Sequence, residues 1–168
     1  MLRLMGAGCI LAGSGAFGFS MAAASRREER ELKELLGILE YLSCELSYRL
    51  TPLTNLCRGA AEGRSGETAS FFLELAKELE RQREPDVHGC VRAVLDLLTM
   101  PASVRQLLEE LGQTLGRFDL PGQLRGLELS IRETETTLRT IREGAPERRR
   151  SWQTLWLCVG AALAILFV

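Results

Sequence analysis

Two uncharged segments at the ends of the chain constrain its fold more than any other feature. From Leu4 to Ala24 the only ionisable residue is Cys9, and from Ser151 to Val168 the only one is Cys158. All 22 acidic residues, and every basic residue except Arg3, lie between these segments. The chain therefore divides into an apolar N-terminal segment, a charged middle and an apolar C-terminal segment.

The first segment has the length of a membrane span. As a helix, Leu4 to Ala24 extends over about 30 Å, which matches the hydrocarbon core of a bilayer. A secretory signal peptide is the alternative, because Ala22-Ala23-Ala24 resembles a small-residue cleavage site. Arg26 and Arg27 follow directly, and positive charge there keeps a segment on the cytoplasmic side. We therefore predict an N-terminal transmembrane helix over residues 1–25.

The second segment, residues 151–168, is predicted to be a C-terminal transmembrane helix. Its roughly 17 residues from Trp152 onward are at the short limit for a span, so a re-entrant or buried helix is the alternative and full crossing stays open. Trp152 and Trp156 suit the headgroup level of a membrane. The basic run Arg148, Arg149 and Arg150 is expected to anchor the cytoplasmic side.

The basic residues near the membrane predict the orientation. They flank the middle of the chain on both sides, whereas only Arg3 lies beyond the spans. Residues 26–150 are therefore expected in the cytoplasm, with both termini outside. Because basic and acidic residues nearly balance over the chain, 21 against 22, no nucleic-acid partner is expected.

The middle of the chain predicts an all-α bundle of about six helices. Apolar residues recur at steps of three and four, and no stretch alternates with period two. The first such stripe contains Leu32, Leu35, Leu36, Leu39, Leu42, Leu46 and Leu50. The expected helices cover roughly 26–50, 52–63, 68–83, 86–99, 103–116 and 121–143. Thr51 is expected to cap the second helix with Pro52 as its first residue, and Gly144-Ala145-Pro146 is expected to end the last.

The residue types argue against catalysis by this chain alone. His88 is the only histidine, so a histidine-based triad or a two-histidine metal site cannot be built. The two lysines, Lys33 and Lys77, do not follow a phosphate-binding loop, and the five cysteines form no C-x-x-C pair. We expect no cofactor and no metal. The alternatives are a membrane-tethered enzyme or sensor with its site in the bundle, and an exported helical protein released by signal cleavage.

Two short sequence motifs lie in the middle of the chain. The first motif consists of Glu45, Tyr48, Thr51, Pro52 and Leu53. The second motif consists of Leu111, Gly112, Leu115, Gly116, Asp119 and Gln123. Glycines four residues apart in a helix predict a close helix crossing, and Asp119 is placed to cap the helix that follows. Between two uncharged spans, these motifs resemble the stage III sporulation protein AB family of endospore-forming bacteria. The sequence departs from the family habit at Pro121-Gly122, where polar residues would be expected.

The resemblance implies a function. It implies a scaffold in the membrane complex that connects mother cell and forespore, located on the mother-cell side of the membrane around the forespore. The cytoplasmic bundle would be similar to the platform-protein domain of type II secretion systems, and would recruit or couple to a cytoplasmic ATPase of the same operon. Contacts with other membrane subunits and with the lipid bilayer are expected, and a homo-oligomer is compatible with the sequence. No catalytic residue comes with the family.

Overall fold

The computed structural model consists, over the residues that it describes, of six α-helices without strands. It describes residues 2–49, 51–82, 84–115 and 119–167, and it describes side chains over 23–49, 51–82, 84–115 and 119–143. The helices are α1 (Leu2–Arg49), α2 (Leu53–Ala61), α3 (Glu67–Arg81), α4 (Val87–Leu97), α5 (Ala102–Thr114) and α6 (Leu120–Phe167). The predicted all-α fold is confirmed.

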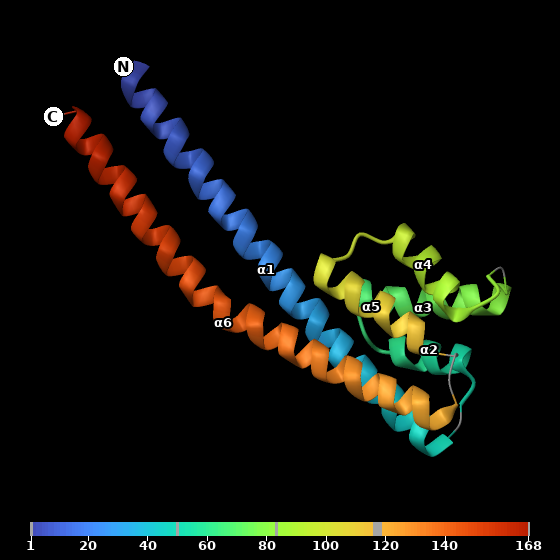
Figure 1. The fold of residues 1–168 in the computed structure, drawn as a ribbon. Helices are drawn as coiled ribbons and strands as arrows, with labels where there is room; N and C mark the ends of the chain where they lie inside the picture. Colours follow the sequence, from blue (N-terminus) through green and yellow to red (C-terminus); the bar gives the residue numbers. More distant parts are fainter. Residues whose placement is uncertain (1, 50, 83, 116–118, 168) are drawn as a thin grey trace.

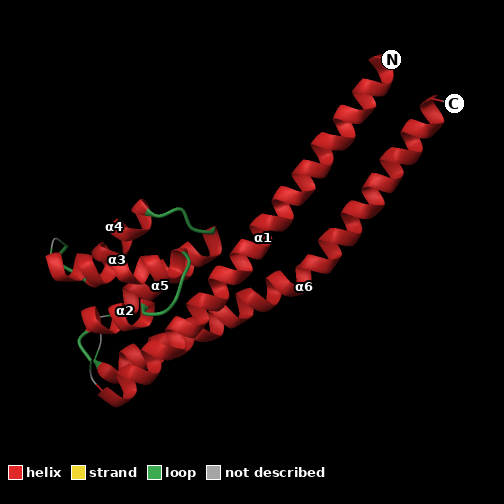
Figure 2. Ribbon diagram, turned by 180° about the vertical axis from the view of Figure 1, so that it is seen from behind, coloured by secondary structure: helices red, strands yellow, loops and turns green. Residues whose placement is uncertain are grey.

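α1 and α6 are the two longest helices of the fold. α1 and α6 have 48 residues each, they run antiparallel, and they pack against each other. The four short helices α2–α5 gather beside the C-terminal half of α1 and the N-terminal half of α6 (Figure 1). Beyond this bundle, both long helices project in the same direction (Figure 2).

The projecting parts are continuous with the bundle. We expected separate helices at the two ends, with Gly144-Ala145-Pro146 ending the last helix of the bundle, and this boundary is wrong because α6 continues to Phe167. An internal proline removes one backbone hydrogen bond and favours a bend, which a helix can tolerate without ending. α6 bends where it leaves the bundle (Figure 1).

Over the part of the chain whose side chains are described, no helical segment is both long enough and apolar enough to cross a bilayer. The two predicted spans fall largely in residues 1–22 and 144–168, outside the described side chains.

The leucine stripe of α1 forms one wall of the core. Five of the predicted residues are buried, and Ile38 joins them, whereas Leu36 is only half-buried and Leu50 lies outside the described residues. The buried members are Leu32, Leu35, Leu39, Leu42 and Leu46. On the opposite side, Phe71 and Phe72 of α3 are fully buried, with ring centroids 5.2 Å apart in an edge-to-face arrangement.

A proline or an aspartate stands directly before the first residue of α2 and of α4. Asp86 caps α4 by accepting a hydrogen bond from the Gly89 N–H at 2.9 Å, as its position before Val87 predicts. The predicted Thr51 cap is wrong: Pro52 is the cap residue of α2, and its carbonyl accepts from the Leu56 N–H at 3.0 Å. Pro52 has ψ 139°, an extended value, so the helix starts one residue later than predicted.

α3 starts without a capping side chain of its own. Gly66 stands at the cap position with φ 117°. Glu31 of α1 serves instead, because its buried carboxylate accepts from the Thr68 N–H and from the Thr68 hydroxyl, both at 2.9 Å. Burial alone would raise the pKa of Glu31, but the hydrogen bonds from Thr68 and Glu67, together with the charge of Arg30, lower it overall.

Gly112 allows α5 to approach α4 closely. A Cβ atom at this position would lie 2.9 Å from the Cβ of Val91 and 3.0 Å from both its γ carbons. Because Val91 is β-branched and fully buried, it has little room to move away. The predicted close crossing is confirmed at Gly112, while Gly116 lies outside the described residues.

We expect Gly112→Ala to lower the stability of the protein. Overpacking against Val91 should cost about 1–3 kcal/mol, and the better helix propensity of alanine should offset about 1 kcal/mol of this. Thermal unfolding of the full chain in detergent measures the difference. Gly37→Ala is the matched control, because its Cβ would meet only the flexible guanidinium of Arg64, and it should leave stability unchanged or higher. Equal melting temperatures for the two variants would contradict this account.

We expect the contribution of Glu31 to disappear in acid. A carboxyl group with a lowered pKa in the folded state stabilises fully above its ordinary value of 4.5, and this stabilisation is lost as the pH falls toward the folded-state pKa. Glu31→Gln should cost about 1–3 kcal/mol at pH 7 and make stability less dependent on pH below about 4.5. Unfolding measured from pH 7 to pH 3 tests this. The exposed Glu40→Gln control should retain the wild-type profile, and an unchanged profile for Glu31→Gln would refute the role of Glu31.

Candidate functional site

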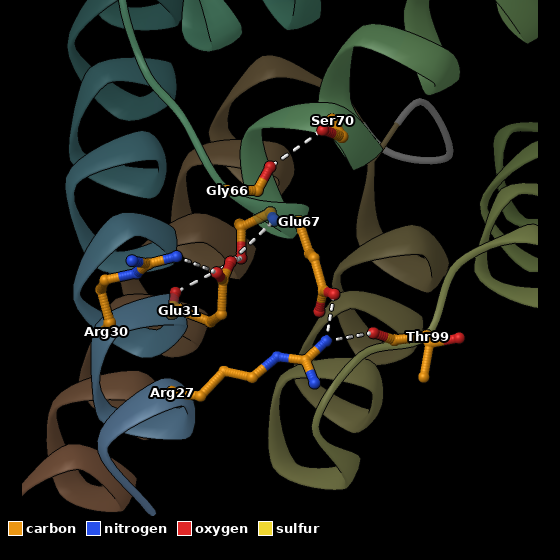
Figure 3. Close-up of polar contacts among 8 residues, drawn as sticks. Arg27, Arg30, Glu31, Gly66, Glu67, Ser70 and Thr99 are labelled. Carbon is orange, nitrogen blue, oxygen red and sulfur yellow. Dashed lines mark hydrogen bonds and ion pairs between the residues drawn. The ribbon is translucent and has the colours of Figure 1, made fainter. Parts of the chain in front are cut away.

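One turn of α1 carries a set of charged side chains that we call the collar, defined as Arg27, Glu28, Glu29 and Glu31. The collar lies at the end of the bundle from which α1 and α6 project (Figure 1). Arg27 contacts the carboxylate of Glu67 and donates to the carbonyl of Thr99 at 3.2 Å (Figure 3). It therefore joins α1 to the start of α3 and to the loop between α4 and α5.

The remaining collar residues reach α5 and α6. Glu28 accepts a hydrogen bond from the Ser103 hydroxyl at 2.6 Å. Glu29 contacts Lys33 at 2.8 Å and Arg142 of α6 at 3.0 Å. The hydrogen bonds from Lys33 and then Arg142 lower the pKa of Glu29. Together with Glu31 and Thr68, these contacts fix α3, α5 and α6 to a single turn of α1.

The predicted anchoring residues divide into two groups. Arg26 and Arg27 are exposed, and the head of Arg27 is held by Glu67 and Thr99. The others fall where side chains are not described. They are Arg148, Arg149, Arg150, Trp152 and Trp156.

The first motif lies around the turn from α1 to α2, at the end of the bundle opposite the projecting helices (Figure 1). Tyr48 is 84% exposed, and Pro52 is also exposed. Glu45, Thr51 and Leu53 are half-buried. The first motif therefore combines packing residues with an aromatic side chain that the bundle does not cover.

The second motif is mainly structural. Leu111, Gly112 and Leu115 are buried at the end of α5. Asp119 is exposed, and its carboxylate accepts from the Gly122 N–H at 3.3 Å while its carbonyl accepts from the Gln123 N–H at 2.9 Å. The predicted capping role of Asp119 is confirmed. Because α6 starts beside the end of α1, Asp119 and Gln123 belong to the same end of the bundle as the first motif.

The collar was not predicted from the sequence, although the position of Glu31 pointed to a buried polar contact. Glu31 lies four and seven residues before Leu35 and Ile38, so it occupies the apolar face of α1. A carboxylate on that face must find a hydrogen-bond donor inside the bundle, which Thr68 supplies. Arg27 and Glu67 carried no such signal, because they are 40 residues apart in the sequence.

No group of three or more histidine, cysteine, aspartate or glutamate residues in the described part could hold a metal ion. Burial raises the pKa of the Cys57 thiol to about 12 and also raises that of Cys90, whereas Cys44 is exposed. A shallow hollow between α2 and α3 contains Arg58 and Arg64, but both are paired, with Glu80 and with Glu34.

Comparisons with known proteins agree with this architecture. The family model described as stage III sporulation protein AB matches residues 3–168. Stage III sporulation protein AB of Bacillus subtilis (strain 168) is 23% identical over 171 residues, covering all of both chains. A solved structure of stage III sporulation protein AB has a TM-score of 0.62 at 20% identity, over 72% of this chain and 98% of that one. The chain therefore belongs to the stage III sporulation protein AB family.

Proposed function

We propose that this chain is a non-enzymatic membrane scaffold of a sporulation complex. Its apolar ends cross the membrane, and the bundle lies in the cytoplasm on the mother-cell side of the membrane around the forespore. The observation that carries the proposal is the common direction of α1 and α6, which leave the bundle together and contain the two apolar segments. Two helices that project in one direction are suited to entering one membrane.

The collar supports a scaffold role. A platform that receives force at one end needs firm connections between its cytoplasmic part and its membrane helices. Arg27, Glu29 and Glu31 supply these connections just after the first apolar segment. The contact between Glu29 and Arg142 also joins the two projecting helices to each other.

The opposite end of the bundle is the proposed contact surface for a secretion-type ATPase of the same operon. Tyr48 is exposed near the end of α1, and Pro52 and Asp119, just before α2 and α6, are exposed as well. Exposed tyrosines are enriched at protein interfaces, where the ring supplies apolar area and the hydroxyl a hydrogen bond. The resemblance to platform proteins of type II secretion systems supports the choice of this partner, with other membrane subunits packing along the projecting helices.

Cys44 should report the side of the membrane on which the bundle lies. It is the exposed one of the three described cysteines, so a membrane-impermeant maleimide should modify it preferentially. In intact cells we expect no labelling, and after permeabilisation we expect labelling that Cys44→Ser abolishes. Mass spectrometry of the purified chain measures both.

Labelling of Cys44 in intact cells would place the bundle outside and overturn the proposed function. A chain that begins after Ala24 in N-terminal sequencing would do the same, because the first span would then have been removed.

Tyr48→Ala should weaken binding of the ATPase. Loss of a central aromatic contact costs about 2 kcal/mol, which corresponds to a roughly 30-fold weaker Kd. Binding of the full-length chain in nanodiscs to the purified ATPase measures this, and counts of heat-resistant spores measure the consequence in cells. Leu73→Ala is the matched control, since Leu73 is an exposed apolar residue on α3 that belongs to neither motif. Unchanged binding by Tyr48→Ala would remove this end of the bundle from the proposal.

A further inference from the structure

The end of α4 and the loop to α5 form an uncharged run at the collar end of the bundle, in which Leu97 is exposed and Leu98 and Met100 are half-buried. The run comprises Leu97, the last residue of α4, and the loop residues Leu98, Thr99, Met100 and Pro101, and it includes no charge. Leu97 is 78% exposed, although most leucines of the bundle are buried. Among the described side chains Leu97 is the most exposed leucine, and it begins a run of five residues without a charge.

The collar fixes the height of this loop along α1. Arg27 holds the carbonyl of Thr99 at 3.2 Å, and Glu28 accepts from Ser103 at 2.6 Å. Arg27 follows Ala24, the last residue of the apolar segment, by three residues, which is about 4.5 Å along a helix. Figure 1 places the loop at the edge of the bundle that faces the projecting part of α1.

Arginine side chains pair with two backbone carbonyls and one carboxylate around the loop. Arg105 donates to the carbonyl of Leu95 at 2.6 Å, near the end of α4, and pairs with Asp96 at 2.6 Å. Arg27 satisfies the carbonyl of Thr99 in the same way. A backbone carbonyl or a carboxylate that leaves water without a hydrogen-bond partner costs free energy. The contacts with Arg27 and Arg105 lower this cost for the loop in an apolar environment.

We propose that residues 97–101 insert into the headgroup region of the membrane that holds α1 and α6. The inference rests on the proposed membrane spans and adds a lipid surface as a direct ligand of the bundle. Apolar side chains of interfacial segments bury themselves about 5–10 Å into the boundary between headgroups and acyl chains. The position of the loop beside Arg27, at the end of the first span, matches that depth.

Depth-dependent quenching tests the proposal. The full-length Leu97→Cys chain, in a Cys44→Ser background, is labelled with a nitrobenzoxadiazole dye and placed in nanodiscs with or without lipids that carry a nitroxide near the headgroup. We expect blue-shifted emission that the nitroxide lipids quench. Leu129→Cys is the matched control, because Leu129 is also exposed but lies near the start of α6, toward the other end of the bundle. Its emission should remain unquenched, and Cys44→Ser alone supplies the background.

Each result decides the question. Quenching at position 97 and not at 129 supports insertion. Equal quenching at both positions, or none at 97, overturns it. Blue-shifted emission at 97 without quenching also overturns it, because the loop would then be covered by protein. Protection of Cys44 in intact cells is measured separately, so a failure of this inference is distinguishable from a failure of the proposed orientation.

Discussion

The packing of the apolar face of α1 is the constraint on which the rest of the structure depends. α2, α3, α5 and α6 all contact α1, and α4 is held through α3 and α5. Burying this face removes apolar area from water at roughly 25 cal/mol per Å², the dominant favourable term in a bundle of this size. The four short helices are nine to fifteen residues long and would be marginal in isolation, so their stability comes from this shared surface.

Polar contacts then determine how the short helices sit on that surface. Apolar packing is not directional, and leucine faces can slide past each other at small cost. Glu31 removes this freedom, because its carboxylate fits one place, the uncapped start of α3. Arg27, Glu28 and Glu29 add contacts to three other parts of the bundle within the same turn. Specific orientation at this end therefore comes from hydrogen bonds, and cohesion comes from the core.

Local signals in the sequence predicted local structure well. The three-and-four spacing of the leucines identified the buried face of α1, Asp86 and Asp119 marked helix starts, and Gly112 marked a close crossing. The predictions from sequence failed where one local rule allows two structures. Pro146 can either end a helix or be accommodated within one, and α6 continues through it; Pro52 suits either the cap or the first helical position, and the structure uses it as the cap. The collar could not be predicted, because its partners are 37 to 113 residues apart and only the fold brings them together.

The unbroken course of α1 has a mechanical consequence. Between Ala24 and Arg49 the helix contains neither a proline nor an interruption, so this part acts as a lever of about 38 Å. By geometry alone, a tilt of this arm by about 10° displaces its far end by roughly 7 Å. Tyr48 lies almost at the tip of this arm. Small rotations of the helix among its neighbours are thereby enlarged into shifts comparable to the diameter of a side chain.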